Sequence, residues 1–235
     1  MRKFLNLSPK ESKGLDKPIY NNALNLKRDA ILITEKRKSY SSASSLLILS
    51  TEECVKSILV LLHSENYNIY RIKEAKNIFS DHVFRHHIAM LIEVALTIFE
   101  NRYKKYQSEN KNQFNTRLKL FEYLKNIVVL FDKIIKTKAN VDYLQEFNNV
   151  KNKGFYVDYR DGLIDPNIEV TIIEYNKILK ISNRVFKFNK LLRILFHKKI
   201  ENHMEKEKIV KWEENIKEFI DHGMTVFSSK ELRKK

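Results

Sequence analysis

Glycine and proline are scarce in this chain. Its 235 residues include 4 Gly and 3 Pro, whereas an all-β fold needs a turn signal about every ten residues. Hydrophobic residues make up 43% of the sequence, which is enough to bury a core and argues against a disordered chain. The composition therefore predicts an all-α protein.

Cysteines and long apolar runs are also missing. Cys54 is the single cysteine, so the chain can form no internal disulfide and offers no thiolate cluster for zinc. No stretch approaches the ~18 apolar residues of a membrane span. The first residues, MRKFLNLSPKESKG, lack the apolar run of a signal peptide. We expect a cytoplasmic protein with no membrane span and no cofactor.

Apolar residues recur at helical spacing along most of the chain. The pattern predicts helices over residues 19–36, 40–62, 69–79, 81–103, 118–135, 141–150 and 203–222, with one or two more over 167–200. The period breaks in NKGFYVDYRDGLIDP, residues 152–166, where the sequence favours an extended backbone near 154–160. Asp165 and Pro166 then indicate the cap and first residue of another helix.

The helices are expected to form one main domain. No linker rich in Gly, Ser or Pro divides the chain, and no internal repeat is visible. We expect a flexible lead over residues 1–18, a helical bundle over 19–200, and a C-terminal helix with a polar tail over 201–235. This last part packs on the bundle or extends from it.

The chain is strongly basic. Lys and Arg number 44 against 29 Asp and Glu, which gives a formal net charge of +15. This charge favours a polyanionic partner, because Lys and Arg side chains neutralise phosphates and release condensed counterions. Solvated basic faces without a partner explain the same charge equally well.

A polar band interrupts the most apolar predicted helix. In LILSTEECVKSILVLL, residues 47–62, Glu52, Glu53 and Lys56 are embedded between aliphatic residues, where an unpaired charge would cost several kcal/mol, roughly the stability of a domain. Glu52 and Lys56 are spaced as an i,i+4 pair, and Glu53 and Lys56 as an i,i+3 pair. The intrahelical pair explains Glu52, so we expect Glu53 to face His82, the extended segment or a second subunit.

A second cluster, DHVFRHH, spans residues 81–87. His82, Arg85 and His86 stand at i, i+3 and i+4 on one face near a helix N-terminus, which suits a phosphate group. A histidine there can act as a general acid or base in RNA cleavage. Histidines hydrogen-bonded within a bundle core are an equally good explanation. We expect no metal, because a third ligand at a characteristic spacing is missing.

Two further segments carry candidate residues. Tyr156 and Asp158 share one side of the extended segment if its side chains alternate, and they either support a site or only cover the bundle. Residues 183–199, NRVFKFNKLLRILFHKK, interleave positive charges with apolar residues, which suits nucleic acid or an anionic membrane surface. A solvated amphipathic helix is the default explanation for this segment.

Three segments together carry a family resemblance. They are NNALNLKRDAILITEKRKSYSSASSLLILSTEECVKSILV, then FSDHVFRHH, then KNKGFYVDYRDG with Asp165 and Pro166. In this order they resemble the AbiV family of abortive-infection proteins, which is placed in the HEPN group of helical domains. The resemblance covers roughly residues 20–170. It implies bacterial antiphage defence in which translation or growth of the infected cell is halted.

The resemblance also implies a mechanism and partners. HEPN proteins are typically dimeric helical bundles, and many are metal-independent endoribonucleases. It points to RNA or the translation machinery as the target, to a homodimer, and to a phage-encoded activator. The usual HEPN signature, an Arg followed after four to six residues by His, is absent from this chain. The alternative is a non-catalytic module that binds RNA or protein to block translation or senses a phage protein.

The site residues expected on this basis fall into three groups. The catalytic candidates are His82, Arg85, Glu53 and Lys56. The RNA-binding or phosphate-binding candidates are His86, Lys153, Arg184 and Lys187. The supporting candidates are Glu52, Tyr156 and Asp158.

Overall fold

The computed structural model describes two long parts of the chain and several short stretches. The described residues are 3–71, 75–90, 92–93, 96, 150, 157–159, 162–197, 206–207, 209–210, 213–214 and 217. The helix predicted over 118–135 lies outside this set, as do the helix predicted over 141–150 apart from Val150 and the candidate residues Lys153 and Tyr156.

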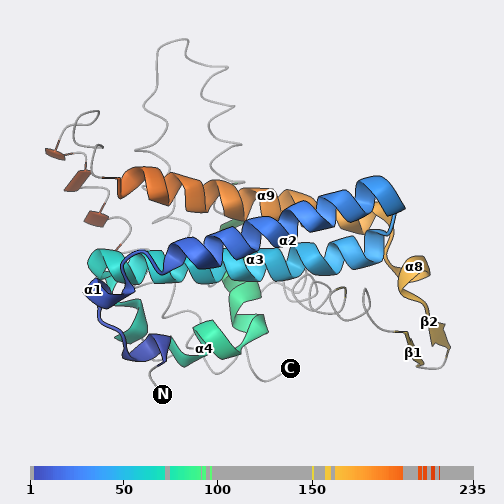
Figure 1. Cartoon of the computed structure of the whole chain (residues 1–235), viewed down its shortest axis with the longest axis horizontal. Helices are drawn as coiled ribbons and strands as arrows, with labels where there is room; N and C mark the ends of the chain where they lie inside the picture. Colours follow the sequence, from blue (N-terminus) through green and yellow to red (C-terminus); the bar gives the residue numbers. More distant parts are fainter. Residues whose placement is uncertain are drawn as a thin grey trace, which may run out of the picture.

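Three long helices form the centre of the structure: α2 (Asp16–Arg37), α3 (Tyr40–Leu62) and α9 (Ile172–Leu195). α2 and α3 are joined by a two-residue connection and run antiparallel, and α9 packs along α3 (Figure 1). α3 is the central helix, because 17 of its 23 residues are buried. The fold is all-α, as the composition predicts.

Small residues allow α2 and α3 to approach closely. Ala23 and Ala30 of α2 are fully buried, one helical heptad apart. Ser50 of α3 donates to the carbonyl of Ala23 at 2.7 Å. Thr51 donates to the carbonyl of Leu47 in its own helix at 2.7 Å. The hydroxyl part of the polar band is therefore satisfied by backbone carbonyls, which removes most of its burial cost.

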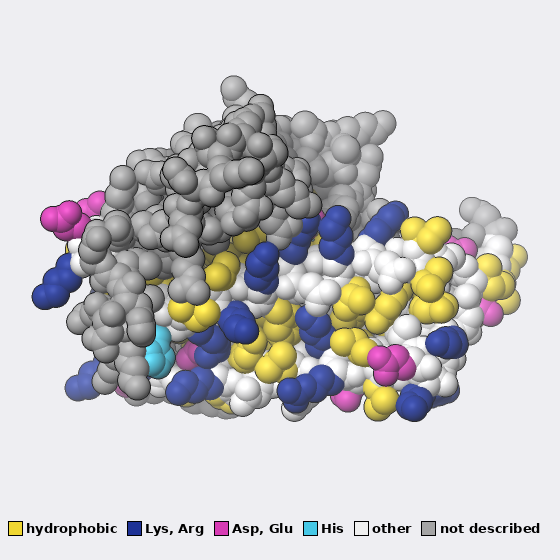
Figure 2. Space-filling view, turned by 90° about the horizontal axis from the view of Figure 1, so that it is seen from above, with side chains coloured by type: hydrophobic (Ala, Val, Ile, Leu, Met, Phe, Trp, Pro, Cys, Tyr) yellow, Lys and Arg dark blue, Asp and Glu magenta, His cyan; other side chains and the backbone are white. Residues whose placement is uncertain are grey.

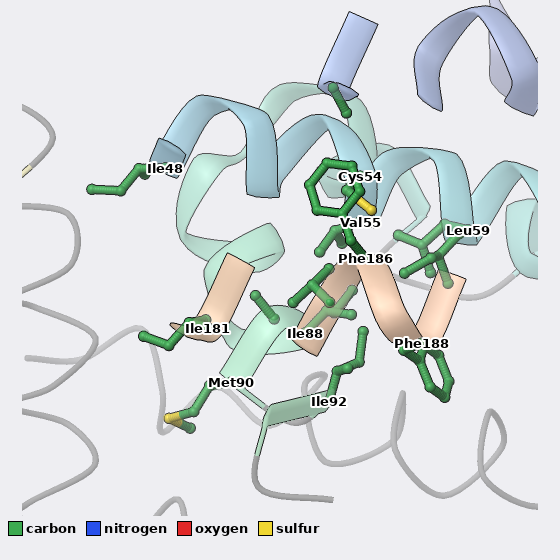
Figure 3. Packing of buried hydrophobic residues seen from close by; sticks show 14 of the residues in the cluster. Ile48, Cys54, Val55, Leu59, Ile88, Met90, Ile92, Ile181, Phe186 and Phe188 are labelled. Carbon is green, nitrogen blue, oxygen red and sulfur yellow. The ribbon is translucent and has the colours of Figure 1, made fainter. Parts of the chain in front are cut away.

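Side chains from three helical segments meet in the core. Figure 3 shows Cys54 and Val55 of α3 beside Phe186 of α9, with Ile88 beneath them. Val55 has no exposed surface and Ile88 is 5% exposed. Ile88 belongs to a helical stretch, residues 82–90, that starts directly after α4 (Ala75–Ser80). Asp81 caps this stretch by accepting the amide of Phe84 at 3.2 Å, which confirms the predicted helix start.

Left-handed backbone positions in the described residues are occupied by Gly14 and by three residues that carry a Cβ. Lys38 ends α2 with a φ of 54°, and Asn66 and Asn68 have φ values of 69° and 53°. The asparagines flank the end of a π-helical turn, η2 (His63–Tyr67), which is followed by a short 3₁₀ helix, η3 (Ile69–Arg71). Asn tolerates this conformation better than other residues with a Cβ.

The N-terminal residues contain two short helices that the sequence analysis missed. These are η1 (Phe4–Asn6) and α1 (Pro9–Ser12). Ser8 and Glu11 form a capping box with Pro9 at the first helical position, which is a readable signal in the sequence. His63 lies 3.2 Å through Nε2 from the carbonyl of Leu7 and ties this segment to η2. The division into three domain segments stays a prediction.

The extended segment forms a minimal β-hairpin. β1 (Asp158–Tyr159) pairs antiparallel with β2 (Leu163–Ile164), with Asp158 opposite Ile164. It leads into α8 (Pro166–Glu169), where Asp165 accepts the amide of Asn167 at 2.8 Å as the predicted cap. The hairpin and α8 lie at the end of the bundle where α2 turns into α3 (Figure 1).

Candidate functional site

Glu52 is the centre of a buried polar cluster. Its side chain is 3% exposed, and both carboxylate oxygens are bound by groups from residues 82–86. Oε1 lies 2.8 Å from Nε2 of His86, and Oε2 lies 3.0 Å from Nη2 of Arg85 and in short contact with Nδ1 of His82. One carboxylate thus holds three basic side chains, which stand on one face of their helix as the spacing predicts.

Arg85 compensates the charge of Glu52. Its guanidinium is buried, with one nitrogen on Glu52 and the other donating to the carbonyl of Ile78 at 2.9 Å. A buried carboxylate needs such a partner, because the desolvation of an unpaired ion costs several kcal/mol. Both ends of the guanidinium fork point inward, so the geometry favours a positioning role for Arg85 over direct contact with a phosphate.

His82 is the member of the cluster that reaches solvent. Its side chain is 51% exposed, against 2% for His86 and 5% for Arg85. Its Nδ1 lies within hydrogen-bond reach of the Glu52 carboxylate and, at 2.9 Å, of Arg85 Nη2. Nδ1 is therefore held on the buried side, and Nε2 is the ring nitrogen left for a substrate.

The two neighbours of Nδ1 allow two proton arrangements. With its proton on Nδ1, His82 donates to Glu52 and Nε2 carries a lone pair that can act as a base. With the proton on Nε2, Nδ1 accepts from Arg85 and Nε2 can act as a donor. A carboxylate and a guanidinium at the same nitrogen thus support both tautomers, which is suitable for general acid–base chemistry.

His87 lies beside the cluster in a different electrostatic state. Burial, and then the positive charge of His86, lower the pKa of His87 to about 4, while Asp81 opposes the shift. His87 is therefore neutral at pH 7, so it adds no positive charge to this helix start.

The expected assignment of the two glutamates is reversed. Lys56 forms its ion pair with Glu53, at i,i+3, and the two side chains are 20% and 23% exposed. Asn22 of α2 also approaches Glu53, at 3.5 Å. Glu52, which the sequence analysis paired with Lys56, turns instead to the helix that begins at His82. The interpretation of Glu53 as the unexplained charge was wrong, and Glu52 takes that place.

The remaining candidates are separate from the cluster. Arg184 forms an ion pair with Glu93 and is 13% exposed, while Lys187 is exposed on α9. For Asp158 the structure describes the backbone, in β1. Arg184 and Lys187 both belong to α9, whereas His82 belongs to the helical stretch after α4.

A second buried polar network was not anticipated from the sequence. Arg193 of α9 lies 2.6 Å from the Asp16 carboxylate and donates to Asn189 at 2.8 Å. Asn189 in turn donates to the carbonyl of Cys54 at 3.4 Å, and Ser57 donates to the carbonyl of Asp16 at 3.0 Å. The signal in the sequence is Asn189, a polar residue within the apolar face of its helix, as the polar band of α3 is.

Metal sites and membrane-spanning helices are both missing from the described residues. They contain no group of three or more His, Cys, Asp or Glu side chains arranged to hold a metal ion. In the same part of the chain, none of the helices combines the length and apolar character needed to cross a membrane.

The described helices form an all-α bundle built on α2, α3 and α9. A family model described as AbiV, within the HEPN group, matches residues 11–187, more than half of the chain, and the chain therefore belongs to the AbiV family. Comparison with curated proteins and with solved structures finds no match. Membership of this family associates the chain with abortive-infection defence.

Proposed function

We propose that this protein is an antiphage abortive-infection toxin that cleaves RNA at the Glu52–His82 cluster. The observation that carries the proposal is the position of His82, half exposed while its Nδ1 is fixed by a buried carboxylate and a buried guanidinium. A purely structural histidine in a bundle core would be buried, as His86 is. His82 has instead the arrangement of an oriented acid–base group.

The chemistry assigned to the cluster is metal-independent cleavage of RNA. His82 Nε2 takes the proton of a ribose 2′-hydroxyl as the O2′–P bond forms and the P–O5′ bond breaks. The departing O5′ takes a proton from water, so the products are a 2′,3′-cyclic phosphate and a 5′-hydroxyl. Glu52 and Arg85 act as positioning residues that fix the ring and its tautomer.

Cleavage of total bacterial RNA tests the proposal. The purified protein is incubated with total RNA in the presence of EDTA, with and without lysate of phage-infected cells, and the ends of the fragments are mapped. We expect fragments with 2′,3′-cyclic phosphate ends, and loss of at least about 100-fold in rate for His82→Ala. The matched control is His197→Ala, an exposed histidine after α9, which should cleave like the wild type.

Two outcomes would contradict this assignment. Equal cleavage by wild type and His82→Ala would remove His82 from the site. No cleavage in either condition would favour the non-catalytic module that blocks translation by binding. Cleavage that requires the phage lysate would support a phage-encoded activator.

We also propose a homodimer, on the strength of the HEPN resemblance. Light scattering during gel filtration measures the mass in solution, and a mass twice that of the 28.1 kDa chain is expected. A monomeric mass at micromolar concentration would contradict it.

A further inference from the structure

The exposed face of α9 has an unusual composition. From Tyr175 to Leu195 the helix contains no Asp or Glu. Over this stretch every exposed residue is Lys or Asn. These residues are Asn176, Lys177, Lys180, Asn183, Lys187 and Lys190.

The apolar side of the same helix is already used by the bundle. Ile178, Ile181, Val185, Phe188 and Leu192 are all buried. A helix that lies in a membrane surface needs an exposed apolar face to insert between the lipids. The first turn of α9 exposes Ile172 and Ile173, but from Tyr175 to Leu195 the exposed positions carry only ammonium and carboxamide groups. A polyanion in water therefore fits this stretch better than a bilayer does.

The neighbouring helix adds to the same charge. Lys27 of α2 donates to Asn183 of α9 at 2.6 Å and lies 4.4 Å from the ring centroid of Phe186. Burial lowers the pKa of Lys27. Figure 2 shows Lys and Arg side chains distributed along the face of the molecule that is seen from above, where α9 is the uppermost labelled helix of Figure 1.

The spacing of the lysines suits a strand that follows the helix axis. Lys177 and Lys190 are separated by about 20 Å along an α-helix, at 1.5 Å per residue. Several consecutive phosphates of an extended strand can lie within that length, and the asparagines offer donors and acceptors to ribose and base groups. The amide and ammonium groups thus follow one another along α9, and from Tyr175 to Leu195 the helix itself contains no carboxylate that would repel a phosphate.

We propose that this face of α9 binds the phosphate backbone of single-stranded RNA. The surface is separate from the Glu52–His82 cluster, and it holds the strand by charge and not by base sequence. The choice of RNA as the nucleic acid rests on the proposed function, whereas the binding surface rests on the exposed residues of α9.

Fluorescence anisotropy of a labelled RNA strand tests the surface. The full-length protein is titrated into a fluorescein-labelled, mixed-sequence RNA of about 20 nucleotides at several salt concentrations. In the test variant, Lys177, Lys180 and Lys190 are replaced by Gln. The control variant carries Lys3→Gln, Lys10→Gln and Lys13→Gln, three exposed positions in the N-terminal segment before α2 that remove the same charge.

The wild type and the control should bind alike, and the α9 variant should bind at least about tenfold more weakly at low salt. Its slope of log affinity against log salt should also be smaller by about 2, since each lost phosphate contact on a single strand removes about 0.7. Far-UV circular dichroism and urea unfolding should show that both variants fold like the wild type.

An equal loss of RNA affinity in the two triple variants would overturn the proposal, because net charge alone would then explain binding. Wild-type affinity of the α9 variant would also overturn it. The proposal would likewise be overturned if the α9 variant lost binding to vesicles rich in anionic lipid while its RNA binding stayed intact, because this would indicate a membrane surface.

The outcome of this RNA-binding test can be separated from the outcome of the RNA-cleavage test. His82→Ala should bind this RNA like the wild type, because His82 lies outside the α9 surface. RNA binding through α9 without cleavage would support this surface and contradict the proposed nuclease. Cleavage without RNA binding through α9 would support the nuclease and contradict this surface.

Discussion

At the scale of single residues, burial separates two adjacent glutamates into different roles. Glu52 is 3% exposed and holds three basic side chains, while Glu53 is 23% exposed and holds Lys56. Neighbouring residues on a helix point about 100° apart, so the packing of one further helix decides which of them is buried. The two residues should therefore respond very differently to the same substitution.

Replacement of Glu52 by Gln should be strongly destabilising. It leaves Arg85 buried without its counter-charge, and breaking one partner of a buried pair costs about 3–5 kcal/mol. Glu53→Gln is the matched control, because the pair that it breaks is partly exposed and contributes at most about 1 kcal/mol. Urea unfolding followed by circular dichroism measures both. An equal loss of unfolding free energy in the two variants would mean that Glu52 does not stabilise the buried cluster.

The thiol of Cys54 should be unreactive in the folded protein. Burial raises its pKa to about 12, so almost no thiolate is present at neutral pH. A chromogenic disulfide reagent should react only after denaturant unfolds the chain, with one thiol per chain. Rapid reaction in native buffer would show that the α3–α9 contact opens.

Acid should destabilise the protein partly through His87. Its pKa of about 4 lies below the usual 6.5, so between these two values the unfolded chain binds more protons than the folded one. The stabilisation is complete above pH 6.5 and is lost as the pH falls through this window, up to about 3 kcal/mol. His63, whose pKa burial also lowers, acts in the same direction.

Urea unfolding near pH 7 and near pH 5 measures this effect. The His87→Gln variant cannot titrate in the window, so it should lose less stability on acidification than the wild type. An identical loss in the two proteins would assign the acid sensitivity to other groups.

At the scale of helices and strands, local signals predicted most starts and ends. Ser39, Asp81 and Asp165, at which the sequence predicted helix starts, each immediately precede an observed helix. The Glu52 pairing could not be predicted in the same way, because its partner His82 lies 30 positions away. Periodicity places a residue on a face of its own helix, but it does not say which other helix will cover that face.

The start of α9 offers a test of one such local signal. Thr171 accepts the amide of Ile173 at 3.2 Å, and Glu174 accepts the amide of Thr171 at 3.1 Å, which completes a capping box. Thr171→Ala should lower the free energy of unfolding by about 1 kcal/mol. Thr34→Ala is the control, because the Thr34 hydroxyl only bonds the carbonyl of Ala30 in its own helix. Its effect should stay within about 0.5 kcal/mol. An unchanged free energy of unfolding in Thr171→Ala would show that the capping box does not stabilise the start of α9.

At the scale of the whole molecule, the bundle is joined through residues far apart in sequence. The Asp16–Arg193 pair links the start of α2 to the end of α9, and Arg193 also stacks 4.5 Å from the ring centroid of Tyr20. These contacts connect the N-terminal and C-terminal parts of the described core directly.

A double-mutant cycle measures the link between Asp16 and Arg193. The variants Asp16→Asn, Arg193→Gln and their combination should give a coupling energy of about 1–3 kcal/mol, because Asp16 is buried. The same cycle on Glu53 and Lys56 should give less than about 1 kcal/mol. Additive effects at residues 16 and 193 would show that the pair does not join the helices energetically.

The late position of α9 has a consequence for how the protein is made. Asn189 bonds to Cys54 across 135 positions of the chain, and a ribosome adds about 5–20 residues per second. α2 and α3 therefore leave the ribosome roughly 7–27 s before the helix that completes their core. Throughout that interval the apolar faces of α3 depend on chaperones or on partial collapse to avoid aggregation. The core that α9 shares with α3 is thus completed only after α9 has left the ribosome.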